Sequence, residues 1–224
     1  MSIIFGYFLI HGIVNYMITP SHLIYSWALA KKTEKNTGND ENPNQKSTKK
    51  RTLAFVLGAL FPDTPTYLFF ILMGLILGYS GEVMWDDMYF NSGWSIPITL
   101  THSFWLWPLL ILMGTYFKLN FLRWFSISAL LHTAVDFCVH TDDAYRHFWP
   151  FSDWKFHSPI SYYRASEYGN WISAFDSLLV LGLLTYLYTK YTGRWRILII
   201  VIGLLYFTRL VTEPVVLMMM NHGA

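Results

Sequence analysis

Long apolar stretches recur along the chain, and short polar connections separate them. Five of these stretches approach the length of about 20 residues that a helix needs to cross a bilayer. They cover residues 53–79, 97–117, 121–139, 171–189 and 196–220. The pattern predicts an all-α fold, a polytopic integral-membrane helical bundle with five or six transmembrane helices.

A further apolar stretch occupies residues 1–30, and Pro20 is expected to kink or break it. Residues 3–16 lack a basic start and a clear small-residue cleavage site, so we interpret them as a retained anchor rather than a signal peptide. Met17 is an alternative start of the protein. The sequence therefore leaves open whether residues 1–16 form a true span.

The polar connections differ in charge. Residues 31–51 are rich in Lys, Asn, Thr and Gly without any aliphatic residue, which predicts a flexible, solvated loop. Two further connections, 118–123 and 190–196, are also basic. If the helices alternate in direction, these connections and the loop lie on the same side of the membrane and together hold twelve of the sixteen Lys and Arg. The positive-inside rule assigns that side to the cytoplasm. The opposite connection, residues 140–170, is too long for a tether, and we expect it to be a structured outer segment of a single membrane domain, 1–224.

Composition narrows the class of protein. Hydrophobic residues make up 54% and charged residues 13% of the 224 positions, against about 45–50% and about 25% in soluble domains. Composition therefore favours a membrane protein over an ordinary water-soluble globule, and membrane lipid is an expected partner. The net charge of +2 gives no basic face for nucleic acid. A lone cysteine, Cys138, excludes an intrachain disulfide and a cysteine-based zinc cage.

Ionisable residues inside the apolar spans are costly and are therefore candidates for function. They are His22, Asp63, His102, His132, Asp136 and Asp176. A spacing of four puts His132 and Asp136 on one helix face, where they can bind one cation or each other. Asp63 stands between Pro62 and Pro65, and broken backbone at membrane depth is tolerated chiefly where it lines a cavity or is buried. For His132 and Asp136 the alternative is a structural hydrogen bond between His and Asp. For Asp63 the alternative is a simple proline kink, with Asp63 capping the helix that follows it.

The segment after this helix adds further ligand types, namely His140, Asp142, Asp143 and His147, with Arg146 among them. Imidazole and carboxylate together suit Zn²⁺, Mn²⁺ or Fe²⁺ rather than copper or an iron–sulfur cluster. Because the set exceeds what one ion needs, one or two ions fit it. The alternative interpretation is a solvated, charged turn.

Several short motifs, taken in order, resemble those of the YdjM-like membrane-bound metal-dependent hydrolases. They are His22 in Thr-Pro-Ser-His-Leu, Asp63 in Leu-Phe-Pro-Asp, Thr101-His102-Ser103, Leu131-His132 followed by Asp136, and Trp149-Pro150-Phe151-Ser152. The resemblance covers residues 17 to about 180. It implies a helical protein of the bacterial inner membrane with a metal site, facing the outer side, on His22, Asp63, His102, His132 and Asp136. A more distant similarity is to zinc-dependent phospholipase C, but this chain lacks that enzyme's additional histidines, which argues against a three-zinc cluster.

The resulting hypothesis is hydrolysis of an ester or phosphoester in a lipid or other amphiphile by metal-activated water. Zn²⁺ is the metal that we expect before Mn²⁺ or Fe²⁺. Its ligands would be His22, Asp63, His102 and His132, with His140 and His147 as further candidates. Asp136 would either bridge ions or orient His132. Asp142 or Asp176 would act as general base, and Arg146, with Arg164, would neutralise a phosphate.

Two other classes of function stay open. Intramembrane His and Asp also mark the pathways of metal or proton transporters. A non-catalytic scaffold could use the basic loop 31–51 to recruit a partner or anionic lipid. The sequence does not reveal the substrate, the number of ions or the oligomeric state.

Overall fold

The computed structural model describes residues 18–34, 44–162 and 164–221. Within these ranges the chain is helical without any strand, which confirms the all-α fold class. The described residues divide into two compact units, and the single membrane domain stays a prediction. One unit, here the terminal unit, holds the described residues up to 34 and from 159 onward, and the central unit holds residues 44–158. The division arises because the first described helix packs on helices from the end of the chain.

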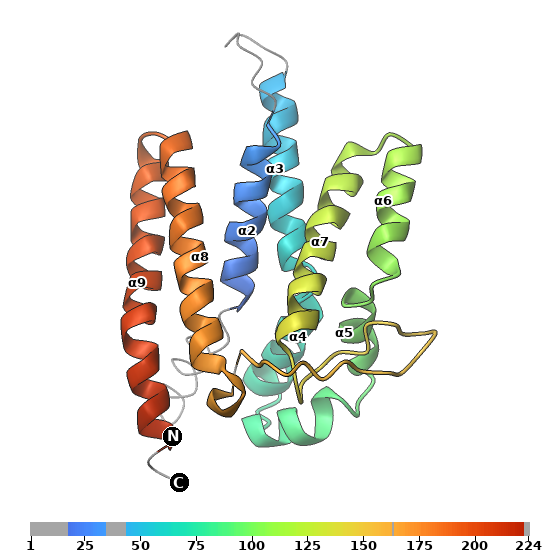
Figure 1. Cartoon of the computed structure of the whole chain (residues 1–224). Coiled ribbons are helices and arrows are strands. Elements are labelled where there is room, and N and C mark those ends of the chain that lie inside the picture. Colours follow the sequence, from blue (N-terminus) through green and yellow to red (C-terminus); the bar gives the residue numbers. More distant parts are fainter. Residues whose placement is uncertain (1–17, 35–43, 163, 222–224) are drawn as a thin grey trace. The chain divides into compact units, whose positions relative to one another are not determined.

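The central unit contains most of the helices in Figure 1. They are α3 (Asn44–Leu60), α4 (Thr64–Phe70), the π-helices η1 (Ile71–Ile76) and η2 (Val83–Tyr89), α5 (Ser95–Thr101), α6 (Leu106–Tyr116) and α7 (Asn120–Val139). Helix α7 packs against both α3 and α6. It is therefore the central element on which the candidate site depends.

Two of the predicted spans are broken in the structure. Helices α3 and α4 meet at an angle of 53°, and so do α5 and α6. Proline explains both breaks, since its ring clashes with the carbonyl four residues earlier and it has no N–H to donate. Pro65 follows the first break directly and starts α4, and Pro108 lies in the first turn of α6. Both breaks carry an ionisable residue, Asp63 in one and His102 in the other.

The basic segment differs from its predicted form. Helix α3 begins at Asn44, so residues 44–51 are helical and not part of a flexible loop. Lys, Arg and Gln are good helix formers, and here they extend the apolar helix that follows. Residues 35–43 and 1–17 lie outside the described residues, including Met17 and the predicted anchor. Pro20 falls in the first described turn of α2 (Ile18–Lys32), where proline is tolerated. The predicted kink or break involves residues before Ile18 and stays a prediction.

The terminal unit consists of α2, the short 3₁₀-helix η3 (Ala165–Glu167), α8 (Gly169–Lys190) and α9 (Arg194–Asn221). Helices α8 and α9 run side by side as a hairpin (Figure 1). Their core contains Val180, Leu184 and Leu187, against which Ile24 of α2 and Ile199 of α9 also pack. Apolar side chains on the other face of α9 are exposed, including Ile197 and Leu204.

Several helices have the length and composition of membrane spans. Among the described residues, α7, α8 and residues 194–212 of α9 qualify, and the count rises from three to five if each bent pair is one span. The exposed apolar face of α9 fits lipid contact. These features are those of a membrane protein, as predicted from composition, while the kind of membrane and the orientation stay predictions.

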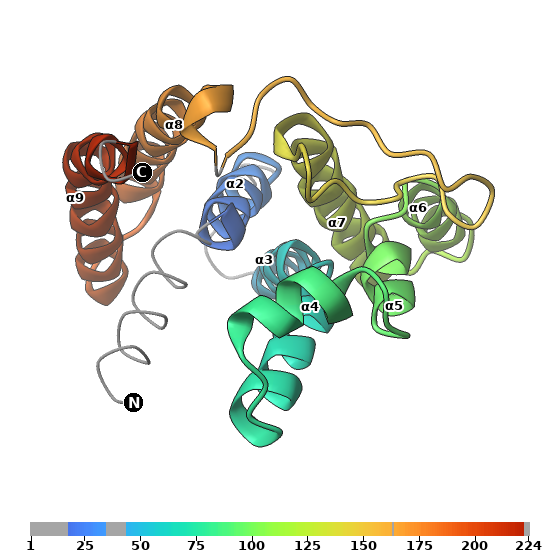
Figure 2. The same cartoon turned by 90° about the horizontal axis from the view of Figure 1, so that it is seen from below.

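Residues 140–158 follow α7 without a regular helix, yet hydrogen bonds hold them to the helices. The backbone N–H of Phe104 donates to the carbonyl of His147 at 2.8 Å, and that of Ser158 donates to the carbonyl of His140 at 3.0 Å. Seen from below, the segment passes α7 and α6 (Figure 2). This part of the predicted outer segment is thus ordered by specific contacts, and residues 159–170 belong to the terminal unit.

Candidate metal centre

The contact between α3 and α7 sets the position of the first histidine. The Ser128 hydroxyl donates to the Phe55 carbonyl at 2.6 Å, and one turn later His132 Nδ1 lies 2.7 Å from the Ala59 carbonyl. Gly58 makes this approach possible, because a Cβ there would lie 2.1 Å from the Phe125 carbonyl oxygen. Matching spacings of four on both helices therefore place His132 beside the end of α3, which Asp63 follows.

A second set of hydrogen bonds joins the two helix breaks. Thr101 Oγ1 at the end of α5 donates to the Pro62 carbonyl at 2.8 Å. The next residue, His102, has its Nδ1 2.8 Å from the Ile98 carbonyl. The Pro62–Asp63 break is thereby tied to the end of α5, and Asp63 and His102 meet although 39 residues separate Thr101 from Pro62 in sequence.

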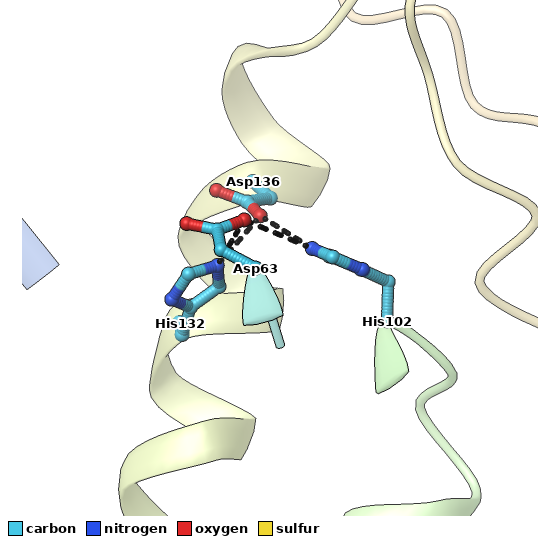
Figure 3. A group of neighbouring side chains, drawn as sticks. All are labelled: Asp63, His102, His132 and Asp136. Atoms are coloured by element: carbon cyan, nitrogen blue, oxygen red, sulfur yellow. Dashed lines mark ion pairs between the residues drawn. The ribbon is translucent and has the colours of Figure 1, made fainter. Parts of the chain in front are cut away.

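Asp63, His102, His132 and Asp136 form a compact group of four donors, here the metal group (Figure 3). The Nε2 atom of His102 lies 3.6 Å from Asp63 and 3.3 Å from Asp136, and that of His132 lies 3.5 Å and 3.1 Å from the same two carboxylates. All four ligand atoms lie within 4.8 Å of one another. Ligands about 2.0–2.1 Å from one tetrahedral ion are about 3.3 Å apart, so the four measured distances fit a shared ion.

The hydrogen bonds of the two histidines determine which ring nitrogen faces the group. Both Nδ1 atoms lie against backbone carbonyls, which only accept, so each Nδ1 carries the proton. A neutral imidazole of this tautomer turns the lone pair of Nε2 toward the carboxylate oxygens. Acceptors that face one another require a cation or a proton between them. Metal-binding histidines commonly donate their other N–H to a carbonyl in this way.

Charge and burial also fit a divalent cation. Two carboxylates and two neutral imidazoles carry a charge that one such ion balances. His102, His132 and Asp136 are at most 2% exposed, and uncompensated carboxylates at such a position are costly. The Asp63 side chain is the most accessible of the four, at 16%. The residues therefore suit a metal ion that is reached from the side of Asp63.

His140, a predicted ligand, lies beside the metal group and is not one of the four. Its Nε2 is 3.8 Å from Asp136 Oδ1, and its Nδ1 is 2.6 Å from Asp143 Oδ2. Burial opposes the charged imidazole, but the Asp143 and Asp136 carboxylates outweigh it and raise the pKa of His140 to about 10. The partner is Asp143, whereas Asp142, the predicted base, is exposed. The spacing of three between His140 and Asp143 is visible in the sequence and could have identified the pair.

His147, a predicted ligand, is not one of the four donors and contacts the backbone of His102 instead. Its ring stacks on Phe104, with 5.1 Å between centroids, and meets Phe137 edge-on. Its Nδ1 lies 2.7 Å from the backbone carbonyl of His102. Burial lowers the pKa of His147 to about 4. The structure thus places it behind His102, as a contact to the backbone that carries that residue.

Tyr145 is a neighbour of the site that the sequence analysis missed. Its ring stacks on the His102 ring at 3.9 Å between centroids and an interplanar angle of 18°. Its hydroxyl lies 3.3 Å from that of Tyr89, which lies 3.1 Å from Thr66 Oγ1. A stack across distant segments leaves no spacing pattern, so only the position of Tyr145 between Asp143 and His147 hinted at it.

The remaining predicted residues are not among the four donors of the metal group. Arg146 is paired with Asp153 at 3.1 Å in the central unit. Asp176 belongs to the terminal unit and accepts from Ser21, Tyr162 and Arg209 at 2.7 to 3.1 Å. His22 and Arg164 also belong to that unit, His22 as a buried residue edge-on to Tyr25. Roles for His22 and Asp176 at the metal group stay predictions.

Comparison with known proteins adds no relative: no family model, no curated protein and no solved structure matches this chain. The resemblance to the YdjM-like hydrolases therefore stays a prediction based on short motifs. The functional argument depends on the geometry of the metal group itself.

Proposed function

We propose that this protein is a membrane-embedded, metal-dependent hydrolase that cleaves an ester or phosphoester bond in a lipid or other amphiphile. One observation carries the proposal: four donor atoms from three separate segments converge, with both histidines oriented by carbonyls. Three of the five motifs that resemble the YdjM-like hydrolases contain these residues, which supports membership in that family.

The donor set favours a particular group of metals. Two imidazoles and two carboxylates suit Zn²⁺, with Mn²⁺ or Fe²⁺ as alternatives. Four donors within 4.8 Å suit one ion. When bound, such an ion supplies Lewis acidity and activates water for attack.

The chain's own residues supply orientation and proton transfer. Asp136 faces both histidines through Oδ2 and His140 through Oδ1, so it fixes the distance between the metal group and that imidazole. Asp143 holds Nδ1 of His140 and turns Nε2 toward Asp136. This arrangement favours His140, oriented by Asp143, as the residue that holds or moves a proton during hydrolysis. Asp142 and Asp176 stay the alternatives that the sequence predicted for this role.

Turnover by the purified full-length chain tests the proposal. Short-chain phospholipids and carboxylic esters, each with and without a chelator, are offered in detergent, and product release is followed. We expect turnover in the wild type and none in the presence of the chelator or in His132→Ala. His140→Gln should lower turnover and keep the bound metal. The exposed Lys49, substituted by Gln, serves as a control. Undiminished turnover in His132→Ala would contradict the proposal.

Metal transport is a second candidate, because two broken spans meet at the metal group. Discontinuous helices of this kind form ion sites in transporters. Purified protein in sealed vesicles distinguishes the two functions. Metal flux that stops in His132→Ala would favour transport, whereas turnover without flux would favour hydrolysis.

A further inference from the structure

A cavity of about 170 Å³ lies in the central unit next to the metal group. Its lining combines the cations Arg146 and Lys155 with the polar residues Asn91, Ser95 and Thr99. Tyr145 and Ile98 also line it. Tyr145 stacks on His102, and the carbonyl of Ile98 accepts from His102 Nδ1. The cavity and the metal group therefore share residues.

The two cations are arranged so that an anion between them would be favourable. The Arg146 side chain is 26% exposed, and its partner Asp153 is 79% exposed, so that pair is a weak surface contact. Lys155 Nζ lies 4.6 Å from the centroid of the Phe90 ring. Burial lowers the pKa of Lys155, and the neighbouring Arg146 lowers it further, while Asp143 opposes both effects. An anion bound in this half-buried cavity would reduce the repulsion between the two like charges.

The volume limits what the cavity can enclose. Sites that enclose a whole small molecule measure about 300–1,000 Å³, and this cavity of about 170 Å³ is smaller. It is several times larger than the roughly 30 Å³ that one water occupies in the liquid. A head group of a few heavy atoms fits these limits, with the rest of the molecule outside.

We propose that the cavity of Arg146 and Lys155 binds the phosphate group of an amphiphilic substrate. Guanidinium binds phosphate with a fork of N–H donors, and ammonium adds a point charge. Ser95, Thr99 and Asn91 offer further donors around them. No bond forms or breaks in the cavity; it selects the substrate and holds it beside the metal group. The inference names the substrate class of the proposed function and depends on that function for turnover, though not for binding.

Calorimetric titration of the full-length chain in neutral detergent tests the binding. The main probe is a dihexyl-ether phosphonate lipid, in which ether bonds replace the carboxylic esters and a P–C bond replaces the phosphate ester, so that no ester remains to be cleaved. Dihexylglycerol diether lacks the phosphorus group, and inorganic phosphate lacks the chains. We expect the phosphonate lipid to bind at least about tenfold more tightly than the glycerol diether, because a charged hydrogen-bond partner contributes about that factor or more. It should also bind at least about tenfold more tightly than inorganic phosphate, because each CH₂ group of the chains that is buried contributes about fourfold in affinity.

Variants locate the binding in the cavity. Arg146→Gln and Lys155→Gln should each weaken phosphonate binding about tenfold or more, since each removes a charged contact. Lys49→Gln removes an exposed charge of the same unit and should leave binding unchanged. Unchanged affinity in both cavity variants would overturn the proposal. Equal affinity for inorganic phosphate and the phosphonate lipid would overturn the assignment of an amphiphilic ligand and would assign the cavity to free phosphate.

Metal content, measured on the same samples, separates the two proposals. If the protein binds metal but its affinity for the phosphonate lipid is the same in the Arg146 and Lys155 variants as in wild type, only the cavity assignment is overturned. Phosphonate binding that needs both cations in a protein that takes up no metal would overturn the proposed hydrolase and leave the cavity assignment standing.

Discussion

Each of the two units buries a group of polar side chains, but the two groups are completed in different ways. In the terminal unit, Asp176 is paired with Arg209 at 3.1 Å. Hydroxyls of Ser21, Tyr25 and Tyr162 also donate to Asp176, and Arg209 donates to Ser173. Here a full negative charge meets a full positive charge within the unit.

In the central unit, two carboxylates face two imidazoles whose protons already point to backbone carbonyls. The comparison teaches that burial and charge alone do not identify a site. A network that its own donors complete stabilises the fold, whereas converging lone pairs need a cation or a proton between them. The predictions that follow test this distinction, from the largest expected effect to the smallest.

The largest effect concerns metal affinity after Asp136→Asn. The substitution keeps the shape and removes one carboxylate, so metal affinity should fall by more than about 100-fold, since partners outside the ligand set alone contribute about 10–100-fold. Competition with a chromogenic chelator measures it. Asp176→Asn is the matched variant in the terminal unit and should keep wild-type affinity. Loss of metal from a folded Asp176→Asn protein would contradict the distinction between the two groups.

Asp176→Asn should instead lower stability. The substitution leaves Arg209 buried without its carboxylate, which costs about 3–5 kcal/mol in comparable buried pairs. Thermal unfolding in detergent measures the loss. Replacing both residues, Asp176→Leu with Arg209→Met, should recover much of it, because no uncompensated charge is then left. A double variant as unstable as the single one would show that the ion pair is not the cause.

Gly58→Ala should weaken both stability and metal binding. The new Cβ would lie 2.1 Å from the Phe125 carbonyl, so α3 and α7 must move apart. Overpacking of this kind costs about 1–3 kcal/mol, and it displaces Asp63 from His132. Gly182→Ala is the control, because nothing lies within 4 Å of a Cβ there. If the two variants unfold at the same temperature, the close approach of α3 and α7 does not position the site.

The smallest effect is expected from Tyr145→Phe. The ring stack on His102 is kept, and only the contact to the Tyr89 hydroxyl at 3.3 Å is lost. Stability should fall by about 0.5–1.5 kcal/mol, the usual contribution of one hydrogen bond. Metal affinity should stay unchanged, which titration on the same sample checks. A large loss of metal would show that Tyr145 belongs to the site itself.

Local patterns in the sequence predicted much of the fold and part of the metal group. The apolar stretches predicted the helices, and the spacing of His132 and Asp136 predicted their common face, because helical periodicity fixes both. The prolines beside Asp63 also predicted a break in the helix. These features depend only on neighbouring residues.

Contacts between distant segments could not be predicted in this way. The bond from Thr101 to Pro62 brings His102 to Asp63, and no pattern in either segment records it. Likewise, the pairing of Asp176 with Arg209 and the division into two units follow from which helices pack together. His140 and His147 have suitable chemistry but lie outside the group of four, and no pattern in the sequence distinguishes them from its members.

Elemental analysis of bound metal tests the central claim most directly. Wild type, Asp136→Asn and Asp176→Asn are purified in detergent, loaded with Zn²⁺, Mn²⁺ or Fe²⁺, and freed of loosely held ions on a chelating resin. We predict close to one ion per chain in wild type and in Asp176→Asn, and none in Asp136→Asn. Folded wild type without metal, or equal metal in all three proteins, would contradict the assignment of Asp63, His102, His132 and Asp136 as a metal site.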